Sequence, residues 1–476
     1  MQTSIEARVS PRERIRRSPG RYQLQGALKL NRTRALLVLI ALATSFATTA
    51  ATALGSPSSG ARVSPASEQH PDQVLEWNQI FIETLIATGT PNSSSQRLGA
   101  IVHTAIFDAY NGIEGRYTPV FVPNVDGNGE TLVPRGASRR AAVIAAAYTA
   151  LVALFPLRER QLNDRYAASL AALSDDGGDG GQSRERGIAW GTQVARAVLA
   201  WRATDGFSAS YPPFTGGTAV GQWRPIPPAT MMSAQGLAFT APFVLASNTQ
   251  FRPDSPRALA SATYTEDFNA VKALGRRTGS TRTEAQTELA PFWEGNASVH
   301  WNQAANQIAR TNDLSMSDSN RLLAVLNIAM ADTAVTIWSA KRHYGANPAE
   351  VTWRPLTAIT LADTDGIAET AADPSWLPLV TTPSHPEYPA GHPALNGAAA
   401  TVLSTHFADA QTFTLTTFGQ PSQTYTSISQ ARADGNDARV WGGMHYPSTV
   451  AVSDAAGEAA ANYVDASSMQ LLRNQQ

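Results

Sequence analysis

Apolar residues recur at helical spacing along most of the chain after residue 73. The first half holds five such segments, separated by breaks that contain glycine, proline or serine, at 74–89, 97–113, 139–155, 160–174 and 186–204. The second half holds six, at 258–274, 281–293, 299–311, 317–344, 393–407 and 450–464. The alternation typical of strands is weak, although 411–418 is compatible with one arm of a short hairpin. We therefore predict a mostly α fold.

Two features of this pattern indicate how the helices are organised. Residues 321–338, RLLAVLNIAMADTAVTIW, are apolar almost all round, which predicts a helix buried at the centre of a bundle. Residues 205–247 are rich in glycine, proline and aromatic residues, and they are too long for a tight turn and too apolar for a disordered linker. We predict an ordered crossover there, joining an N-terminal helical lobe at 73–204 to a C-terminal helical lobe at 248–476.

The first seventy residues have the pattern of a targeting segment. Basic residues precede an apolar run at 35–46, and small residues follow it. We interpret 1–54 as an export signal and 55–72 as a flexible linker, which predicts a periplasmic or secreted protein without a stable membrane span after cleavage. Alanine and threonine dilute the apolar run before it reaches the roughly 20 residues that span a bilayer. An uncleaved membrane anchor is the alternative.

Composition excludes several classes of function. The chain has 476 residues, of which 43% are hydrophobic, and its formal net charge of −1 indicates a soluble globular protein without a nucleic-acid-binding surface. It has no cysteine, so it has neither disulfides nor a thiol that an oxidant could attack.

Three segments of the C-terminal half carry candidate chemistry. They are the region of Lys341 and Arg354, the turn HPEYPAGHPALNG at 385–397, and the region of Arg439 and His445. Taken singly, each has a structural explanation, such as a lysine that complements a helix dipole. Together they supply what an oxyanion requires: guanidinium forks, an ammonium group and backbone N–H groups at a helix start. Gly391 has no side chain to keep an anion from its N–H.

These segments resemble the signature of the superfamily that joins vanadium-dependent haloperoxidases with type 2 phosphatidic acid phosphatases. The signature is Lys…Arg-Pro, then Pro-Ser-Gly-His, then Arg with His six residues later. The residues at the corresponding positions are Lys341, Arg354 and Pro355, then Pro389, Ala390 in place of serine, Gly391 and His392, and then Arg439 and His445. Short sequence segments from VLEWNQI to WGGMH resemble the sequences of bacterial haloperoxidases over nearly the whole chain after residue 73.

The resemblance implies a vanadate site in the C-terminal bundle and a role for each matched residue. His445 would be the metal ligand and, with His392 as acid–base group, one of two catalytic residues. Lys341, Arg354 and Arg439 would hold the equatorial oxygens with the Gly391 N–H. Hydrogen peroxide, a halide and a small organic acceptor would be the partners. Related enzymes are often dimeric, so a homodimer is one expected state.

Other positions tune or depart from the family pattern. His385, seven residues before His392, and Trp338, three before Lys341, would line the halide pocket, and His385 favours bromide. Lys341 precedes Arg354 by thirteen residues, more than is usual, so residues 345–350 must bulge; otherwise Arg342 or His343 would substitute.

Two further departures concern polar groups around the expected anion. Ala390 stands where the family usually has serine, which removes one hydroxyl donor and predicts weaker cofactor retention. The aspartate that usually follows the ligand histidine by four residues is Thr449, so orientation of the imidazole would pass to Thr449, to Asp454 or to a backbone carbonyl. Arg224 repeats the Trp-Arg-Pro phrase but lies in the crossover, and we exclude it from the site.

Two other functions stay open. The same cage suits phosphate, so the chain could be an exported acid phosphatase in which His445 forms a phosphohistidine and His392 protonates the leaving alcohol. A non-catalytic oxyanion-binding or structural protein is the third reading, if the departures at 345–350, Ala390 and Thr449 mark a decayed site. The whole-chain phrasing favours the haloperoxidase.

Overall fold

A long apolar helix lies at the centre of the fold. The computed structural model describes residues 72–173 and 181–472, and this helix is α9 (Met316–Gly345). Every residue from 322 to 341 is buried, as the all-round apolar sequence predicts. Among the described helices, α9 is long and apolar enough to cross a membrane, as the bent pair α3–α4 would be if taken as one span, but the apolar stretch of α9 is entirely buried in protein.

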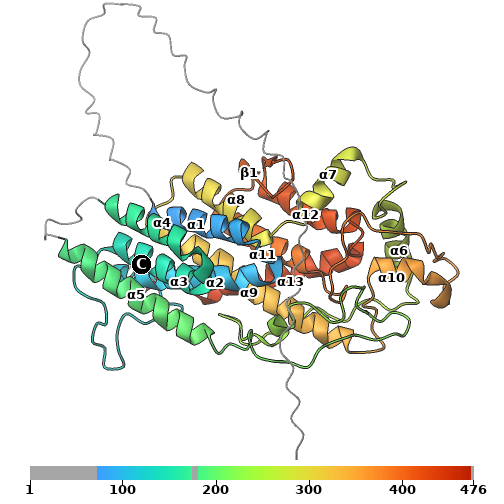
Figure 1. Ribbon diagram of the computed structural model, residues 1–476, viewed down its shortest axis with the longest axis horizontal. Helices are drawn as coiled ribbons and strands as arrows, with labels where there is room; N and C mark the ends of the chain where they lie inside the picture. Colours follow the sequence, from blue (N-terminus) through green and yellow to red (C-terminus); the bar gives the residue numbers. More distant parts are fainter. Residues whose placement is uncertain (1–71, 174–180, 473–476) are drawn as a thin grey trace, which may run out of the picture. The chain divides into compact units, whose positions relative to one another are not determined.

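The N-terminal half folds into the five predicted helices. Asp72 caps the first of them, accepting hydrogen bonds from the N–H groups of Val74 and Leu75 at 2.8 and 3.2 Å. In Figure 1 these helices gather in blue to green at one side of α9. They are α1 (Gln73–Thr88), α2 (Asn92–Glu114), α3 (Arg139–Leu154), α4 (Glu159–Ala171) and α5 (Gln182–Arg202).

The C-terminal half contains two helices that the apolar pattern does not predict, α10 and α12. Helix α12 is polar along most of its length, and α10 is only six residues long. Helix α11 starts two residues before its predicted bound. The elements after the crossover are α6 (Ala262–Leu274), α7 (Glu284–Phe292), α8 (Ala297–Thr311), α9, α10 (Pro355–Thr360), α11 (Gly391–His406), β1 (Phe413–Leu415), β2 (Gln423–Tyr425), α12 (Ile428–Trp441) and α13 (Pro447–Ser467).

The predicted mostly α fold is confirmed, and the two halves share one hydrophobic core. Buried residues of α1, α2, α3 and α5 pack in the same cluster as those of α8, α9, α11 and α13. The short strands β1 and β2 form one antiparallel pair, with Phe413 opposite Tyr425, where the sequence indicates a hairpin arm. The lobe bounds at 73–204 and 248–476 stay predictions.

The crossover at 205–247 is bound along the surface of α9. The Asp332 carboxylate on α9 accepts hydrogen bonds from the N–H groups of Phe243, Val244 and Leu245 at 2.6 to 3.0 Å. Earlier in the crossover, Trp223 is buried, and its backbone N–H donates to Thr352 Oγ1 at 3.2 Å. These contacts place the crossover beside the segment that leads to Arg354.

The predicted export signal at 1–54 and nearly all of the predicted linker at 55–72 lie outside the described residues.

Candidate active site

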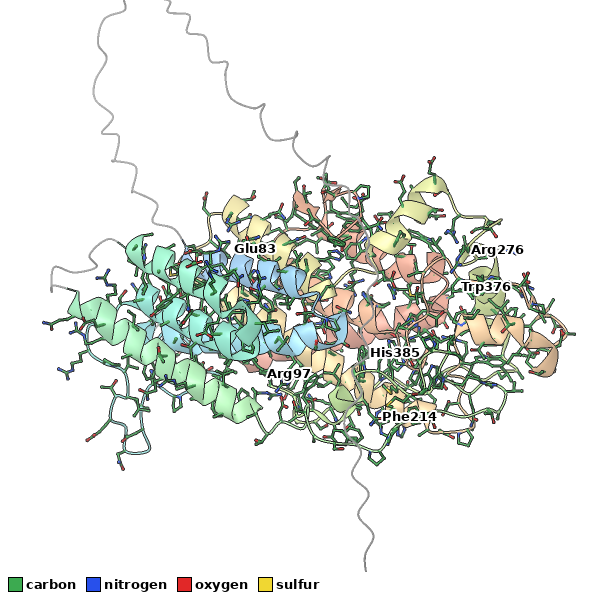
Figure 2. The ribbon with its side chains drawn as sticks, in the orientation of Figure 1. Glu83, Arg97, Phe214, Arg276, Trp376 and His385 are labelled. Carbon is green, nitrogen blue, oxygen red and sulfur yellow. The ribbon has the colours of Figure 1, made fainter. Side chains whose placement is uncertain are left out.

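The three chemically marked segments meet at one cavity of about 200 Å³. Helix α9 brings Trp338, the loop before α11 brings His385, and the start of α11 brings Gly391 and His392. His385 is labelled in Figure 2. The end of α12 and the turn after it bring Arg439, Met444 and His445. The remaining lining residues are Asn92, Ser93, Ser233, Glu294 and Pro383, so both halves of the chain contribute.

The start of α11 presents backbone donors to the cavity. Ala390, in extended conformation, is its first flanking residue, and its side chain makes no capping hydrogen bond in this part of the structure. The N–H groups of the first turn therefore remain available to an anion. A Cβ added at Gly391 would meet the Trp338 ring at 3.3 Å, so glycine keeps the backbone close to the cavity wall.

A tight turn joins Arg439 to His445. Helix α12 ends at Trp441, and Gly443 has a φ of 77°, in the left-handed region. A Cβ at Gly443 would lie 2.6 Å from the Gly275 carbonyl oxygen, so the close approach also requires glycine. The Arg439 carbonyl accepts the N–H groups of Met444 and His445 at 3.0 and 3.3 Å. This turn explains why the histidine follows the arginine by six positions.

Arg439 is a buried cation with an unused donor. Its Nη1 donates to the Trp293 carbonyl at 3.3 Å and its Nη2 lies 3.0 Å from the Met444 sulfur, whereas its Nε has no partner among the described residues. Burial lowers the pKa of Arg439 to about 10. A buried N–H without an acceptor costs about 1–3 kcal/mol, and an oxyanion in the cavity would supply that acceptor.

Arg354 lies behind the cavity wall and contacts both loop histidines. It follows the exposed turn at 346–349, so the long spacing after Lys341 is accommodated by a bulge, as predicted. Its Nη1 lies 3.0 Å from His445 Nε2, and its Nη2 lies 2.7 Å from His385 Nδ1. Burial lowers the pKa of Arg354 to about 9. A guanidinium group only donates, so both histidine nitrogens accept.

Lys341 is used differently from the prediction. Its Nζ donates to the carbonyls of Pro386, at 2.7 Å, of Glu387, at 3.2 Å, and of Pro389. An ammonium group has three N–H donors, so these carbonyls use all of them. Burial holds the pKa of Lys341 well below its ordinary value. Lys341 therefore fastens the loop and contributes its charge to the site from behind the wall.

The predicted substitutes for Lys341 point elsewhere. The Arg342 guanidinium lies 5.2 Å from the ring centroids of Phe214 and Phe239, and His343 packs against Tyr344 with ring centroids 4.9 Å apart. Arg224 donates to the carbonyls of its own loop, at Thr218 and Ala219. Its exclusion from the site agrees with this placement.

Glu387 is a site residue that the sequence reasoning did not identify. Its side chain is 1% exposed, and its Oε1 lies 3.0 Å from His445 Nδ1. Burial raises the pKa of Glu387, and the cations Arg257, Arg354 and Lys341 oppose that rise. Burial and the neighbouring cations hold the pKa of His445 well below its ordinary value, so the imidazole is neutral. The motif HPEYPAGH contains this carboxylate, which was the available signal.

His392 stands between the two halves of the molecule. Its Nε2 lies 3.1 Å from the Gly295 carbonyl and 3.4 Å from Asn92 Nδ2 at the start of α2. The carbonyl can only accept, so Nε2 carries the proton in the neutral ring and Nδ1 is the basic atom. Burial, with Arg439 nearby, holds the pKa of His392 well below its ordinary value. Asn92 was not predicted, because 300 residues separate it from His392.

Of the two predicted orienting residues, one acts indirectly and the other lies elsewhere. Thr449 donates to Glu387 Oε2 at 3.1 Å and thus reaches His445 only through the carboxylate. Asp454 is not placed to orient His445, because Arg432 binds both of its oxygens at 2.8 and 2.7 Å. The strong guanidinium donor competes for that carboxylate.

We expect Ala390→Ser to strengthen oxyanion binding about tenfold and to raise stability by about 1 kcal/mol. Serine would restore a hydroxyl donor at the start of α11, where one added hydrogen bond to a charged oxygen contributes about 1.5–3 kcal/mol and a serine N-cap about 0.5–2 kcal/mol. Vanadate titration and thermal unfolding measure the two effects. A higher melting temperature with unchanged affinity would show that the hydroxyl caps the helix without reaching the anion.

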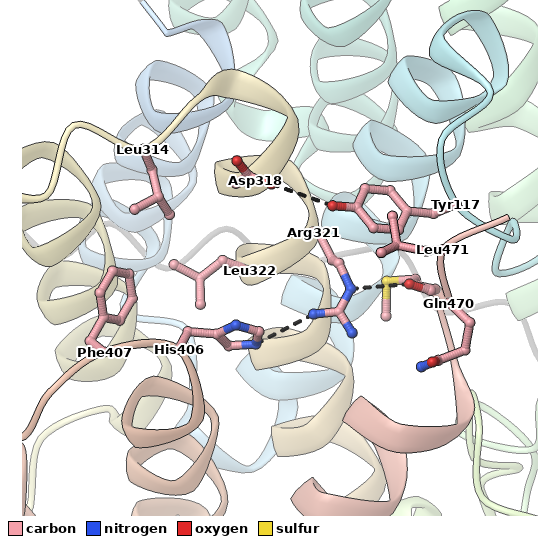
Figure 3. Close-up of a pocket in the computed structure, with 10 residues that line it drawn as sticks. Tyr117, Leu314, Asp318, Arg321, Leu322, His406, Phe407, Gln470 and Leu471 are labelled. Carbon is pink, nitrogen blue, oxygen red and sulfur yellow. Dashed lines mark hydrogen bonds between the residues drawn. The ribbon is translucent and has the colours of Figure 1, made fainter. Parts of the chain in front are cut away.

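A second cavity, of about 440 Å³, lies near the far end of α11 (Figure 3). Its most polar residue, Arg321, is already paired: Nη2 binds Asp465 Oδ1 at 2.9 Å and Nε binds the Met469 carbonyl at 3.0 Å. His406 is exposed beside it, with its Nε2 3.4 Å from Arg321 Nη1. None of the predicted site residues lines this cavity in the described ranges, so it is the weaker candidate.

Comparisons with known proteins match the region that carries the candidate site and the fold of the chain. Residues 321–474 match the family described as the VCPO second helical-bundle domain. No curated protein matches the chain. A crystal structure of a bacterial vanadium-dependent iodoperoxidase superimposes with a TM-score of 0.71 at 23% identity, covering 85% of this chain and 98% of that one.

Two structures of a bacterial vanadium-dependent chloroperoxidase are also similar. The holo form has a TM-score of 0.59 at 17% identity and covers 78% of this chain and 90% of that one; the apo form has the same score and identity and covers 79% and 94%. The resemblance found in the sequence is thereby confirmed: this chain has the fold of bacterial vanadium-dependent haloperoxidases, and 321–474 carries their second helical-bundle domain.

Proposed function

We propose that the protein is a vanadium-dependent haloperoxidase, which oxidises a halide with hydrogen peroxide at a protein-bound vanadate. One observation carries the proposal: Arg439, a buried cation whose Nε has no partner among the described residues, lines the same cavity as His445 and the uncapped start of α11. Arg354 and Lys341 add two cations behind the wall, so that three cations face two carboxylates among the described residues around the cavity, the buried Glu387 and the cavity-lining Glu294. This surplus of positive charge favours an anion.

The residues present fit vanadate. His445 Nε2 is the nitrogen that would bind the metal, the Arg439 Nε–H and the Gly391 N–H would hold oxygens, and Arg354 would donate to the anion from beside His445. When bound, vanadate supplies a Lewis-acidic centre at which hydrogen peroxide is activated toward two-electron oxidation of a halide. Lys341 keeps the loop of Glu387 and Gly391 in place and adds its charge.

His392 is the proton-transfer group of the proposed site. Its Nε2–H is held by the Gly295 carbonyl, which leaves Nδ1 to accept and return a proton. Its depressed pKa makes the ring neutral near pH 7, so it is a base at the start of the cycle. Glu294 borders the same cavity and brings a carboxylate near Arg439.

We propose bromide as the preferred halide and a small organic molecule as the acceptor. Trp338 and His385 form one wall, with ring centroids 5.3 Å apart. Because Arg354 donates to His385 Nδ1, the neutral His385 ring carries its proton on Nε2 and can donate a hydrogen bond. A polar donor beside an apolar indole suits a large, polarisable and weakly hydrated anion.

An acid phosphatase is the second candidate, and the orientation of His445 supports it. The lone pair of Nε2 is turned toward Arg354, as a nucleophile poised beside an anion-binding guanidinium would be. Phosphate would occupy the same cavity, His445 would form the phosphohistidine, and His392 would protonate the leaving alcohol.

One assay separates these functions. Purified protein loaded with orthovanadate is given hydrogen peroxide and bromide, and halogenation of monochlorodimedone is followed; p-nitrophenyl phosphate hydrolysis without vanadate is measured in parallel. We expect vanadate-dependent halogenation. Phosphoester hydrolysis without halogenation would establish the phosphatase instead, and neither activity would favour the non-catalytic reading.

We also propose that the protein is exported with cleavage near residue 54 and that it forms a homodimer. The apolar run at 35–46, followed by small residues, supports export. Amino-terminal sequencing of protein recovered outside the cytoplasm and light scattering of that protein test the two proposals; an intact amino terminus or a monomeric mass would contradict them.

A further inference from the structure

The Glu387 carboxylate makes three hydrogen bonds at the back of the cavity. Oε1 lies 3.0 Å from His445 Nδ1 and accepts the Tyr446 N–H at 3.1 Å. Oε2 accepts the Thr449 hydroxyl at 3.1 Å. His445 and Glu387 are 2% and 1% exposed, so water does not compete for these bonds. A buried carboxylate satisfied in this way has one fixed orientation.

The neighbours of His445 determine which ring nitrogen carries its proton. Arg354 Nη1 lies 3.0 Å from Nε2, and a guanidinium group has no acceptor, so Nε2 must accept. The proton is then on Nδ1, which faces the carboxylate of Glu387. The contacts with Arg354 and with Glu387 both require the tautomer that is protonated on Nδ1. In this tautomer the lone pair of Nε2 can bind a metal once Arg354 donates to the bound anion instead.

The loop that carries Glu387 is fastened from two directions. The backbone N–H of Glu387 donates to the Thr352 carbonyl at 2.9 Å, and the backbone carbonyl of Glu387 accepts from Lys341 Nζ at 3.2 Å. On the carboxylate side, Arg257 donates to the Thr449 hydroxyl at 3.2 Å and pairs with Asp267 at 3.0 Å. The buried lysine and the loop carboxylate therefore form one support for His445.

We propose that Glu387 is the positioning residue of the site, holding the proton of His445 on Nδ1 so that Nε2 faces the oxyanion. This inference rests on the proposed function. Four residues after His445 the chain has Thr449, which cannot supply a carboxylate; its hydroxyl instead fixes the carboxylate that arrives from the loop before α11. A carboxylate on the far nitrogen of a ligand imidazole makes the near nitrogen a stronger ligand.

The direct test reads the tautomer without vanadate, peroxide or halide. Nitrogen-15 spectra of labelled histidines are recorded for the wild type, Glu387→Gln and Glu387→Met. In the wild type we expect the His445 proton on Nδ1. The glutamine carbonyl can still accept that proton, so Glu387→Gln keeps the tautomer. In Glu387→Met the Nδ1 proton has no acceptor, and Arg354 Nη1 can keep its bond to the Met444 carbonyl alone, so part of the population changes to the Nε2–H form. An unchanged tautomer in Glu387→Met would overturn the proposal.

Vanadate affinity supplies the second readout. Orthovanadate titration is expected to show binding weakened roughly 10- to 100-fold in Glu387→Met, as for other outer partners of metal-bound histidines, and by about tenfold in the nearly isosteric Glu387→Gln. Equal affinity in all three proteins would contradict the proposal. If the wild type binds no vanadate and oxidises no bromide, the proposed function fails while the tautomer result still stands.

A matched variant separates positioning from general stability. Asp108, on α2, is also a fully buried carboxylate, and it accepts the N–H groups of Val120, Phe121 and Val122 at 2.8 to 2.9 Å. Asp108→Asn should lower the melting temperature and leave both the His445 tautomer and vanadate affinity unchanged. If Asp108→Asn weakens vanadate binding as much as Glu387→Met does, the effect is one of stability and the proposal is wrong.

Discussion

Replacing His445 with asparagine should abolish vanadate binding and, with it, vanadate-dependent oxidation of bromide. The shorter side chain keeps a donor for Glu387 and an acceptor for Arg354, so the two buried charges retain partners. It has no imidazole nitrogen to bind the metal. Vanadate titration and the halogenation rate measure the loss, and thermal unfolding checks that the variant folds.

The matched control is His406→Asn, because His406 lies at the opposite end of α11, beside the second cavity (Figure 3). This variant should bind vanadate and oxidise bromide like the wild type. If His445→Asn retains vanadate affinity within tenfold of the wild type, the metal ligand is another residue and the proposed site is misassigned.

Arg439→Met is expected to weaken vanadate binding roughly 10- to 100-fold while leaving the vanadate-free protein as stable as the wild type or more stable. The first effect follows from losing a charged hydrogen bond, which contributes about 1.5–3 kcal/mol. The second follows from burial: the lowered pKa of Arg439 reports that its charge is poorly solvated, and its Nε lacks a partner among the described residues. A methionine of similar length removes that cost.

Arg432, seven residues earlier on α12, is the control for this prediction. It binds Asp454 at 2.7 Å and Glu458 at 2.6 Å, and the Asp454 hydrogen bond is the main reason its pKa is raised. Arg432→Met should therefore lower the melting temperature without changing vanadate affinity. If Arg439→Met destabilises the protein as much as Arg432→Met does, Arg439 has a structural role and its donor is not reserved for an anion.

The sequence predicts most of this fold because its helices are amphipathic or wholly buried. It does not predict α12, since Asp434, Gly435, Asn436 and Asp437 interrupt any apolar repeat. Gly435 is needed there because a Cβ would meet the Trp293 ring at 2.9 Å, a contact that no local pattern reveals. Arg439 was found through its spacing from His445, although the helix that carries it was missed.

The residues of the candidate site that belong to local sequence motifs could be predicted, whereas contacts between residues far apart in the sequence could not. Gly391, His392, Arg439 and His445 line the cavity as the motifs predict. Lys341 does not, because backbone carbonyls close in space satisfy its ammonium group. The contribution of Asn92 could not be predicted, since it depends on how α2 packs against the second bundle.

The participation of α2 has a practical consequence for protein engineering. Residues 321–474 contain every cation and histidine of the proposed site, so they look like a portable catalytic module. Transplanted alone, they would expose the side of α9 that α2 covers and would lack Asn92, Ser93, Ser233 and Glu294 at the cavity, together with the Gly295 carbonyl that His392 contacts. A host scaffold would have to provide an apolar helix along α9 whose amino-terminal end reaches His392. Diversity among such catalysts is therefore expected at that partner helix, where a graft can alter substrate access without touching the anion cage.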